Sequence, residues 1–474
     1  MKKPAFVLMM VVLIGLARVD AQAFENAPAQ SLFDQASYYL SFNYHGFSGT
    51  DPNSAAFVEK YQKQLDLSCF VQRQNCAYDV AVPLIQAMVE EIGDEHTNYL
   101  APDAAEDFVS STTGENSNEQ VTMGFIPIPF SDEKGYGLRV YDVLEGSGAA
   151  SAGLARGDRI IAINQQAFGR DLAVVRKLLL AADASGQDVR LSVLRDERNL
   201  LELTVPSRKL VVSSLPYMSV GGGVARIVIP EFVGPAKTAP KFHELIKRAI
   251  DRKVAAIVVD LRNDPGGVST ECLAGAGAFV GNYGRLRESR FGRFQDLYRD
   301  GGVYQVDEKG KETKVYQIEN SQLWTGKLAV LVNENSASCS EYFASDVQYA
   351  KRGVVIGERT AGVGNTGTRL FNLINGGGLQ ITVVKSFHLD GTVYPDKVTP
   401  SVFIKDDLEG FVFTGRDNLM ERALQELGVR NSPKTLRVNP EVQKRFWFEA
   451  PKARVSSASN SVLELAKNAV WGLQ

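Results

Sequence analysis

The sequence has few cysteines and histidines, the residues from which most structural zinc centres are built. Its 474 residues include only four cysteines and four histidines, and none shows the close Cys/His spacing of a zinc site. The formal net charge is −3, so no excess of positive charge favours nucleic acid or an anionic membrane surface as a partner. The composition therefore predicts neither a structural metal nor nucleic-acid binding.

Long apolar runs are absent except at the N-terminus. Lys2 and Lys3 precede an apolar run at residues 5–17, and small residues follow it. The pattern is typical of a secretory signal peptide, because these thirteen residues are fewer than the roughly 20 that span a bilayer. We expect cleavage after Ala21, with Ala23 as the next choice, and a periplasmic or secreted chain without a membrane span. A short membrane anchor is the alternative.

Export permits disulfide bonds, and the four cysteines differ in what their spacing indicates. Cys69 and Cys76 lie close enough in the sequence to close a short loop. Cys272 and Cys339 are far apart, and the sequence does not tell whether they pair.

After the signal peptide at residues 1–21, the pattern of the chain changes three times. A polar, helical stretch is followed by short strands around one expected helix at residues 172–182, and then by apolar strands that alternate with helices. Such apolar strands predict a largely parallel sheet covered on both faces. We place the boundaries at 24–115 for the helical N-terminal region, 119–210 for the β-rich domain, 211–407 for the α/β core and 408–474 for a helical C-terminal extension.

One turn in the α/β core has the composition of a catalytic loop. The apolar strand at residues 327–332 leads into a polar turn with Ser336, Ser338 and Ser340, and a helix-compatible segment follows. Strand–turn–helix units carry nucleophiles in α/β enzymes, and free N–H groups at the start of the helix stabilise a developing anion. The alternative is that the serines only cap the helix.

The β-rich domain resembles a PDZ domain. Met123-Gly124-Phe125-Ile126 matches the carboxylate-binding loop of that family, and Ala152–Ile160 matches its A-G-L-x-x-G-D-x-I stretch. The resemblance implies that N–H groups of the loop hold a terminal carboxylate while the neighbouring strand edge pairs with an extended peptide. A small β-domain that binds no ligand is the alternative.

The α/β core is similar to the C-terminal processing peptidases, also called tail-specific proteases, and to their tricorn-type relatives. Asp260–Gly267 resembles the family's D-L-R-x-N-x-G-G loop, Asn335–Glu341 its S-A-S-x-S-E motif, and Gly357–Thr360 the start of its G-E-x-T segment. The resemblance implies a multidomain α/β protein with a helical N-terminal region, an inserted PDZ domain, a mixed α/β core of the ClpP/crotonase-like type and a helical tail.

The same resemblance assigns the centre of the site. Ser338 is the nucleophile by this comparison. The oxyanion hole consists of the N–H of Cys339 and that of Gly266 or Gly267, where a side chain would block the approach of the scissile carbonyl.

The general base departs from the best-known pattern of the family. Bacterial tail-specific proteases use a Ser–Lys dyad, but Val363 stands in the place of that lysine and Gly367 in that of its supporting glutamine. Valine cannot accept a proton. Tricorn-like branches use Ser–His–Glu, with the histidine in a D-x-H-[ST] motif that Asp94–Thr97 matches, so the resemblance implies His96 as the base.

The remaining histidines and the third catalytic group leave alternatives open. His388 is the second choice for the base, whereas we expect solvated roles for His45 and His243. A carboxylate orients the imidazole in such triads. Asp396, in the degenerate closing motif, lies at about the right distance after the nucleophile, and Asp390 is the alternative.

Together these features predict an exported serine endopeptidase that cleaves unfolded or C-terminally tagged polypeptides through an acyl-enzyme. The PDZ domain would capture the substrate tail, and the chemistry needs no metal or organic cofactor. Polypeptides are then the partners, and a homo-oligomer is compatible with the sequence. The alternative, which the loss of the lysine supports, is a catalytically inactive PDZ-bearing scaffold or adaptor on a protease core.

Overall fold

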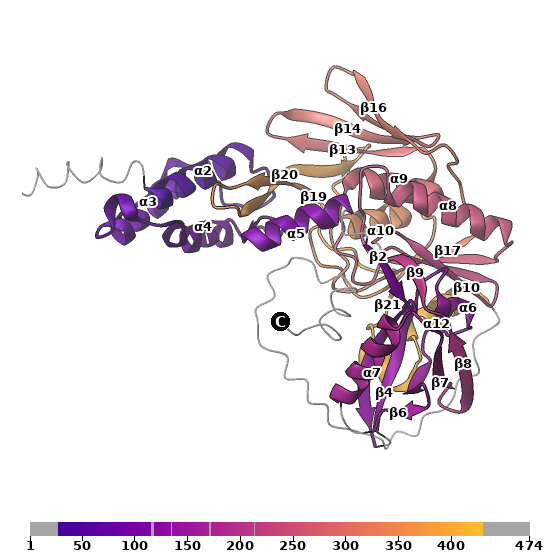
Figure 1. Ribbon diagram of the computed structural model, residues 1–474. Coiled ribbons are helices and arrows are strands. Elements are labelled where there is room, and N and C mark those ends of the chain that lie inside the picture. Colours follow the sequence, from indigo (N-terminus) through magenta and orange to yellow (C-terminus); the bar gives the residue numbers. More distant parts are fainter. Residues whose placement is uncertain (1–26, 115–117, 134, 170–171, 213, 430–474) are drawn as a thin grey trace, which may run out of the picture. The chain divides into compact units, whose positions relative to one another are not determined.

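The computed structural model describes residues 27–114, 118–133, 135–169, 172–212 and 214–429 (Figure 1). The predicted signal peptide at residues 1–21 and the part of the predicted C-terminal extension after residue 429 lie outside the described residues. The chain divides into two compact units, each described by itself. Unit 1 comprises Met1–Val109, Leu286–Phe294 and Thr366–Gly391, and unit 2 comprises Ser110–Arg285, Gln295–Asn365 and Thr392–Gln474.

Helices form most of the N-terminal part of unit 1. They are α2 (Pro28–Asn43), α3 (Ala55–Cys69), η1 (Arg73–Asn75), α4 (Tyr78–Ile92) and α5 (Pro102–Thr113), whose last residues belong to unit 2. Ser54 caps α3 by accepting a hydrogen bond from the Phe57 N–H, and Gly93 ends α4 at a φ of 68°. A disulfide joins Cys69 to Cys76, which confirms the short loop that their spacing indicated.

Antiparallel strands complete unit 1. β20 (Gly378–His388) pairs with β1 (Asn98–Leu100) and with β19 (Thr366–Asn372). Leu379 of β20 is buried in the same hydrophobic cluster as Ile85 of α4. The β19–β20 hairpin, which comes late in the sequence, therefore packs on the N-terminal helices.

The β-rich domain of unit 2 contains an antiparallel sheet, one short helix and one long helix. Its elements are β2 (Asn118–Thr122), β3 (Phe125–Asp132), β4 (Gly135–Val143), α6 (Gly148–Ser151), β5 (Arg159–Ile163), β6 (Gln166–Ala167), α7 (Leu172–Ala184), β7 (Val189–Arg195), β8 (Asn199–Val205) and β9 (Arg208–Val212). The sheet order is β3-β4-β5-β7-β8, and β2 pairs separately with β9. α7 confirms the expected helix, and its Val175 and Leu179 are buried in one cluster with Leu138 and Val193 of the sheet.

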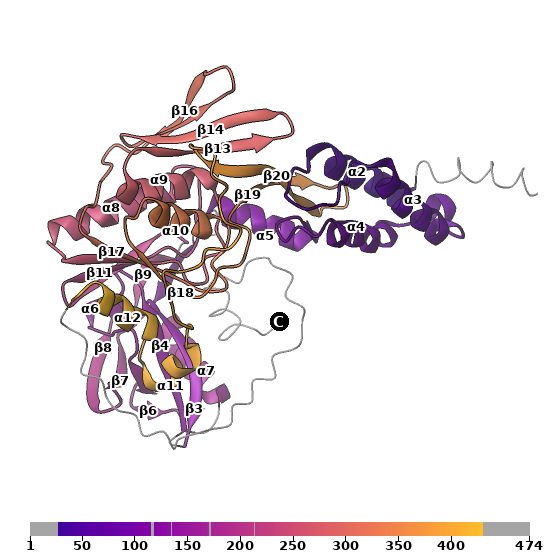
Figure 2. The same ribbon diagram turned by 180° about the vertical axis from the view of Figure 1, so that it is seen from behind.

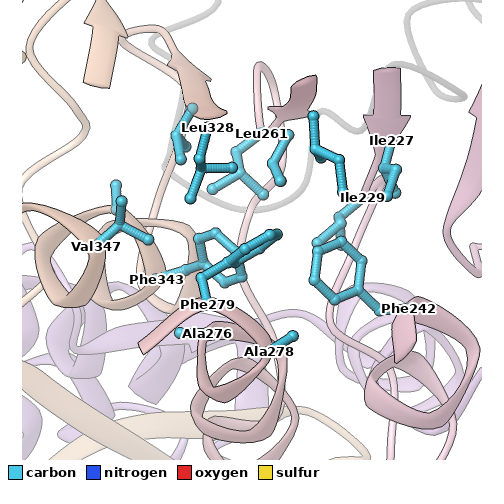
Figure 3. Packing of buried hydrophobic residues seen from close by; sticks show 14 of the residues in the cluster. Ile227, Ile229, Phe242, Leu261, Ala276, Ala278, Phe279, Leu328, Phe343 and Val347 are labelled. Atoms are coloured by element: carbon cyan, nitrogen blue, oxygen red, sulfur yellow. The ribbon is translucent and has the colours of Figure 1, made fainter. Parts of the chain in front are cut away.

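The α/β core of unit 2 has a mostly parallel sheet covered on both faces, as predicted. Its elements are β10 (Tyr217–Gly221), β11 (Val224–Val228), α8 (Thr238–Asp251), β12 (Ala256–Asp260), α9 (Ser269–Val280), β17 (Lys327–Val332), α10 (Cys339–Tyr349), β18 (Val354–Gly357), β21 (Val402–Phe403) and α12 (Asn418–Glu426). The order is β10-β11-β12-β17-β18-β21. α8, α9 and α10 cover one face, and α12 packs on the other (Figure 2). Phe242, Phe279 and Phe343, one from each of the three helices, meet beneath the strands (Figure 3).

The remaining elements extend this core. β13 (Tyr283–Ser289) and β14 (Gly292–Arg299) contribute residues to both units. β14 continues antiparallel into β15 (Gly302–Val306) and β16 (Glu312–Gln317). α11 (Leu408–Thr414) returns to the β-rich domain, where its Phe411 packs with Ile126 and Tyr141.

Candidate active site

The serine turn connects β17 to α10 in unit 2, and one of its residues has an unusual backbone. Ser338 has a φ of 51° and a ψ of −109°, whereas residues with a side chain rarely adopt a positive φ. Strained residues of this kind gather at functional sites, and serine nucleophiles occur on sharp strand-to-helix turns. The backbone therefore singles out Ser338 within the turn.

The three serines of the turn have different surroundings. Ser336 is fully buried, and its hydroxyl donates to the Leu261 carbonyl oxygen at 2.8 Å. Ser340 is also fully buried, and its hydroxyl donates to the Asp264 carbonyl oxygen at 3.1 Å. Ser338 is partly exposed. Two of the serines therefore hold the turn together, and Ser338 is the one that a substrate can reach.

The glycine pair of the D-L-R-N-D-P-G-G loop lies against this turn. Gly266 and Gly267 have φ values of 102° and 131°, which strain any residue with a side chain. A Cβ at Gly266 would lie 2.7 Å from the Ser338 Cβ and 2.8 Å from the Cys339 nitrogen. Glycine is therefore required for the close approach of the two loops.

The hydrogen bonds distinguish the two glycines as oxyanion donors. The Gly266 N–H donates to the Asp264 carboxyl oxygen at 2.8 Å, so it is engaged within its own loop. Among the described residues, neither the Gly267 N–H nor the Cys339 N–H has an acceptor. The sequence left Gly266 and Gly267 open, and this pattern favours Gly267.

A disulfide bond fixes the residue that follows Ser338. Cys339, the first residue of α10, is bonded to Cys272 of α9, 67 residues earlier in the sequence. The sequence left this pairing open, because only the folded chain places α9 beside α10. The residue that carries this N–H is therefore linked through its side chain to a neighbouring helix.

Glu341 holds the segment after β18 against the serine turn. Its carboxylate accepts the N–H groups of Ser338, Gly362 and Val363, each at 2.9 Å. It also accepts the Thr360 hydroxyl at 2.6 Å. Burial raises the pKa of Glu341 to about 7, and these hydrogen bonds oppose the shift. Sequence reasoning gave Glu341 no role, although a glutamate at the third position of a helix is a capping-box signature.

Val363 therefore contacts the site through its backbone. Its side chain is apolar and largely buried, so it supplies no base. A lysine reaches the same segment from elsewhere in unit 2, since Nζ of Lys397 lies 3.2 Å from where a Cβ at Gly362 would stand. The preceding residue, Asp396, accepts the Gly364 N–H on its carbonyl oxygen at 2.9 Å. Sequence reasoning missed Lys397, because only the fold brings these two segments together.

His96 belongs to unit 1, in the turn between α4 and β1. The Asp94 carboxylate fixes this turn by accepting the His96 N–H and the Thr97 hydroxyl, both at 3.0 Å. The ring Nδ1 lies 2.9 Å from the Thr366 hydroxyl oxygen. Burial lowers the pKa of His96 to about 4, with Asp94 opposing the shift and Arg287 reinforcing it. The imidazole is therefore neutral at pH 7.

The other three histidines have surroundings of different kinds. His243 is fully buried, with Nε2 3.0 Å from the Ala274 carbonyl oxygen and Nδ1 accepting a backbone N–H at 2.8 Å. The expectation of a solvated His243 is wrong, because the residue lies on the buried side of α8. His45 is partly exposed and pairs with Glu288, and His388 is buried at the end of β20 in unit 1.

The two candidates for the third catalytic group are both exposed. Asp396 lies in unit 2, and its carboxylate accepts the N–H of Lys397 at 2.7 Å. Asp390 belongs to unit 1. Neither carboxylate is shielded from solvent in the described structure.

The predicted carboxylate-binding loop begins the sheet of the β-rich domain. Gly124 has a φ of 78°, and its N–H donates to a neighbouring threonine hydroxyl at 3.1 Å. Met123 and Phe125 pack into the core of this domain. Ile126 packs on the other face of the sheet, against Phe411 of α11. The four loop residues are therefore divided between two faces.

Buried ion pairs connect the D-L-R motif to the β-rich domain. Arg226 of β11 bonds Asp142 of β4 at 2.8 Å and Asp260, the first residue of the motif, at 2.9 Å. Arg262 bonds Asp260 at 2.7 Å and Asp417 at 2.8 Å. Burial alone would raise the pKa of Asp260, but Arg262 and Arg226 hold it below its usual range. The charged residues of the motif therefore act as a structural network beneath the glycine pair.

Metal sites and membrane spans concern the described part of the chain alone. No group of three or more His, Cys, Asp or Glu side chains there could hold a metal ion. No helix there is long and apolar enough to cross a membrane.

Comparison with protein families places these features in context. Residues 223–403 match the model of peptidase family S41, and residues 123–206 match the model of the PDZ domain. The chain therefore carries an S41 peptidase domain preceded by a PDZ domain. This confirms the resemblance to the C-terminal processing peptidases.

Individual relatives match this chain at low sequence identity. The tail-specific protease of Haemophilus influenzae is 27% identical over 352 residues, which cover 70% of this chain and 46% of the relative. A probable CtpA-like serine protease of Staphylococcus aureus is 28% identical over 380 residues, which cover 78% of this chain and 68% of the relative. The solved structure of a photosystem II D1 C-terminal processing protease matches with a TM-score of 0.39 and 22% identity, over 82% of this chain and 98% of that one. The chain thus spans about half the length of the first relative and about two thirds of the second.

Proposed function

We propose that this chain is a serine endopeptidase that cleaves unfolded or C-terminally tagged polypeptides. One observation carries the proposal: Ser338 stands at a positive φ between β17 and α10, beside the Cys339 N–H and against Gly266. A reachable nucleophile beside backbone donors is the arrangement that acyl transfer requires. The S41 domain and the names of the relatives support the same activity.

In the proposed reaction the Ser338 hydroxyl attacks the scissile carbonyl carbon and gives its proton to a general base. The carbonyl oxygen becomes an oxyanion that accepts hydrogen bonds from the N–H groups of Gly267 and Cys339, each worth about 3–4 kcal/mol in the transition state. The base then protonates the leaving amine, and water hydrolyses the acyl-enzyme. The proposal includes no metal or organic cofactor.

We propose His96 as the general base. Its imidazole is neutral at pH 7, and Thr366 holds Nδ1, which leaves Nε2 for the serine.

One contact favours a second candidate for the base. The Lys397 amine lies near Gly362. The next residue, Val363, occupies the position that the catalytic lysine has in the Ser–Lys relatives. A neutral amine at this position could take the Ser338 proton through the same steps. With His96 as the base, the Thr366 hydroxyl already occupies Nδ1, so Asp396, our proposed third catalytic group, would have to replace that hydroxyl in order to orient the imidazole.

The PDZ domain indicates which substrates this peptidase would take. We propose that it captures the C-terminal segment of an unfolded polypeptide, with Met123–Ile126 as the carboxylate-binding loop, and delivers the chain to Ser338. On the basis of the predicted signal peptide, we propose that this activity acts in the periplasm or outside the cell. Nucleic acid takes no part, and a homo-oligomer is compatible with the proposal.

The alternative function is a scaffold that binds polypeptide tails without cleaving them. Val363 favours it, because this residue removes the proton acceptor that the Ser–Lys relatives use. Both functions share tail capture and differ only in whether Ser338 is activated.

A fluorophosphonate probe separates these two functions, because it reacts with activated serine hydroxyls. Intact-mass spectrometry should show a single adduct on the folded wild type and none on Ser338→Ala. Heat-unfolded wild type is the matched control and should also stay unlabelled. Absence of any adduct on folded wild type between pH 6 and pH 9 would favour the scaffold.

A further inference from the structure

The edge strand of the PDZ domain carries two prolines. β3 stands at the end of the sheet order, so among the described residues only β4 pairs with it. Its sequence, F-I-P-I-P-F-S-D, contains Pro127 and Pro129. Peptide ligands of PDZ domains add a strand at a sheet edge, and such pairing uses N–H donors that proline lacks.

The hydrogen-bond pattern shows which way Pro127 faces. The Leu144 N–H donates to the Gly124 carbonyl oxygen at 2.9 Å, so the backbone carbonyl of Gly124 faces β4. The register between β3 and β4 shifts between Ile126 and Pro127, so the direction of Pro127 has to be taken from its own partner on β4. Val140, which stands opposite Pro127, uses both its N–H and its carbonyl oxygen in bonds of 2.9 Å to Gly157–Asp158. Val140 has no backbone group left for Pro127, which therefore faces the free edge.

The neighbouring edge positions follow from the period of two along a strand. The backbone groups of Pro129 point to the free edge as those of Pro127 do. The backbone groups of Phe125 point the same way, and Phe125 has an N–H to donate. The edge thus offers carbonyl oxygens at all three positions but an N–H only at Phe125. A ligand strand therefore finds only one N–H donor at the three edge positions of β3. Each missing hydrogen bond lowers affinity about 2- to 13-fold.

One face of β3 and β4 packs against α11. Ile126 and Tyr141 pack with Phe411 of α11. The buried Arg139 side chain donates to the Phe413 carbonyl oxygen at 3.0 Å. α11 therefore covers one face of β3 and β4 and leaves the backbone groups of the edge uncovered by this contact.

We propose that this PDZ domain reads only the end of its ligand, namely the terminal carboxylate and the last side chain. Pro127 and Pro129 weaken extended strand pairing further upstream, because each removes one backbone N–H donor. The proposal rests on the tail capture proposed above and narrows it to polypeptides that are selected by their C-terminal residue, whatever sequence precedes it. It replaces the expectation that the strand edge pairs with an extended peptide.

Peptide binding to the full chain with Ser338→Ala, which prevents cleavage, tests this proposal. The probes are fluorescein-labelled Ala-Ala-Val, a nine-residue peptide that ends in these residues after Thr-Ser repeats, and the C-terminal amide of each. Fluorescence anisotropy should show the two acids binding within about threefold of each other. Each amide should bind at least tenfold more weakly than its acid.

Pro127→Ala combined with Pro129→Ala restores the missing donors. When both proline changes are added to the Ser338→Ala chain, the nine-residue acid should bind at least fourfold more tightly than it does to Ser338→Ala alone, while the affinity of the three-residue acid stays unchanged. Ser131→Ala, on the same strand, is the matched control and should alter neither affinity. Size-exclusion chromatography and circular dichroism establish that the variants remain folded and equally dispersed.

The outcomes separate this proposal from tail capture itself. If the Ser338→Ala chain with both prolines intact binds the nine-residue acid more than tenfold more tightly than the three-residue acid, the short footprint is wrong and tail capture stands. The same conclusion follows if the proline variant shows no gain for the longer acid. If acids and amides bind equally, tail capture fails, and the short footprint fails with it.

Discussion

Glu341 is the single residue on which the geometry of the serine turn depends most. It accepts the N–H of Ser338 on one side and that of Val363 on the other, and it is fully buried. Burial raises its pKa from the ordinary 4.5 to about 7. The contacts around the nucleophile are therefore linked to a titration near neutral pH.

Glu341→Gln should remove a pH-dependent part of the stability. A carboxyl with a raised folded pKa holds its proton more tightly in the folded state, so its contribution is complete below about pH 4.5 and is lost as the pH rises through about 7. Relative to Glu341→Gln, wild type should lose about 3 kcal/mol of unfolding free energy between pH 4 and pH 8. Urea unfolding across this range measures the difference.

Glu334→Gln, at an exposed position in the same turn, is the control and should follow wild type at every pH. A difference between wild type and Glu341→Gln that stays constant with pH would show that Glu341 does not titrate in this range.

His96→Gln and Lys397→Met decide between the two candidate bases. Loss of the base lowers kcat about 10²- to 10⁴-fold with little change of KM, and we expect this fall in His96→Gln. Glutamine keeps a hydrogen-bonding group for Thr366, and circular dichroism checks the fold. Lys397→Met should keep kcat within about threefold.

The pH profile gives an independent reading of the same question. A lysine base makes kcat/KM rise through the alkaline range, because only the unprotonated amine accepts a proton. With His96, which is already neutral at pH 7, no such rise should appear. A large loss in Lys397→Met together with an active His96→Gln would transfer the role to Lys397.

Motif letters identified Ser338 as the candidate nucleophile but not which glycine N–H is free. That depends on the Asp264 carboxyl turning back to the Gly266 N–H, a side-chain direction that the sequence does not contain. The burial of His243, in contrast, could have been predicted from the sequence, because apolar residues lie on the same side of α8.

At the scale of elements, the disulfide between α9 and α10 is placed where it can affect the chemistry. Cys339 follows Ser338 and is a proposed oxyanion donor, so its bond to Cys272 restrains that donor. The bond spans 67 residues, whereas Cys69–Cys76 spans 7. Loop-closure entropy then gives about 4 kcal/mol of stability for the first bond and about 2.5 kcal/mol for the second.

Replacing Cys272 and Cys339 by serine together should lower kcat about 10- to 100-fold with little change of KM, because a displaced donor weakens the transition state rather than substrate binding. The same two changes at Cys69 and Cys76, in unit 1, are the matched control and should leave kcat within about twofold. Steady-state kinetics at a temperature where both variants are folded gives the comparison. An unchanged kcat in the first variant would show that helix packing alone places the donor.

The hydrophobic periodicity of the sequence predicted the helices and strands better than it predicted which of them pair or pack together. Continuous apolar strands correctly indicated the parallel, doubly covered sheet, because only buried strands can be apolar on both sides. The pairing of β20 with β1 was not predictable, since it joins segments almost 300 residues apart through tertiary packing alone. The Cys272–Cys339 bond escaped prediction for the same reason.

At the scale of the whole molecule, the PDZ domain and the α/β core that carries Ser338 belong to one unit. Arg226 connects the PDZ sheet to Asp260, and Arg262 connects Asp260 to Asp417. The order of the domains followed from the motifs, because each motif occurs within one domain. The charged network could not be predicted, because its members come from β4, β11, the D-L-R motif and the start of α12.

Cleavage of an unfolded polypeptide by the whole chain tests the central claim most directly. Reduced and carboxymethylated casein incubated with the chain lacking residues 1–21 should yield peptides that mass spectrometry identifies. Ser338→Ala, at the same concentration and with the same circular dichroism spectrum, should leave the casein intact. Degradation by Ser338→Ala at the wild-type rate, or intact casein after incubation with wild type, would contradict the account.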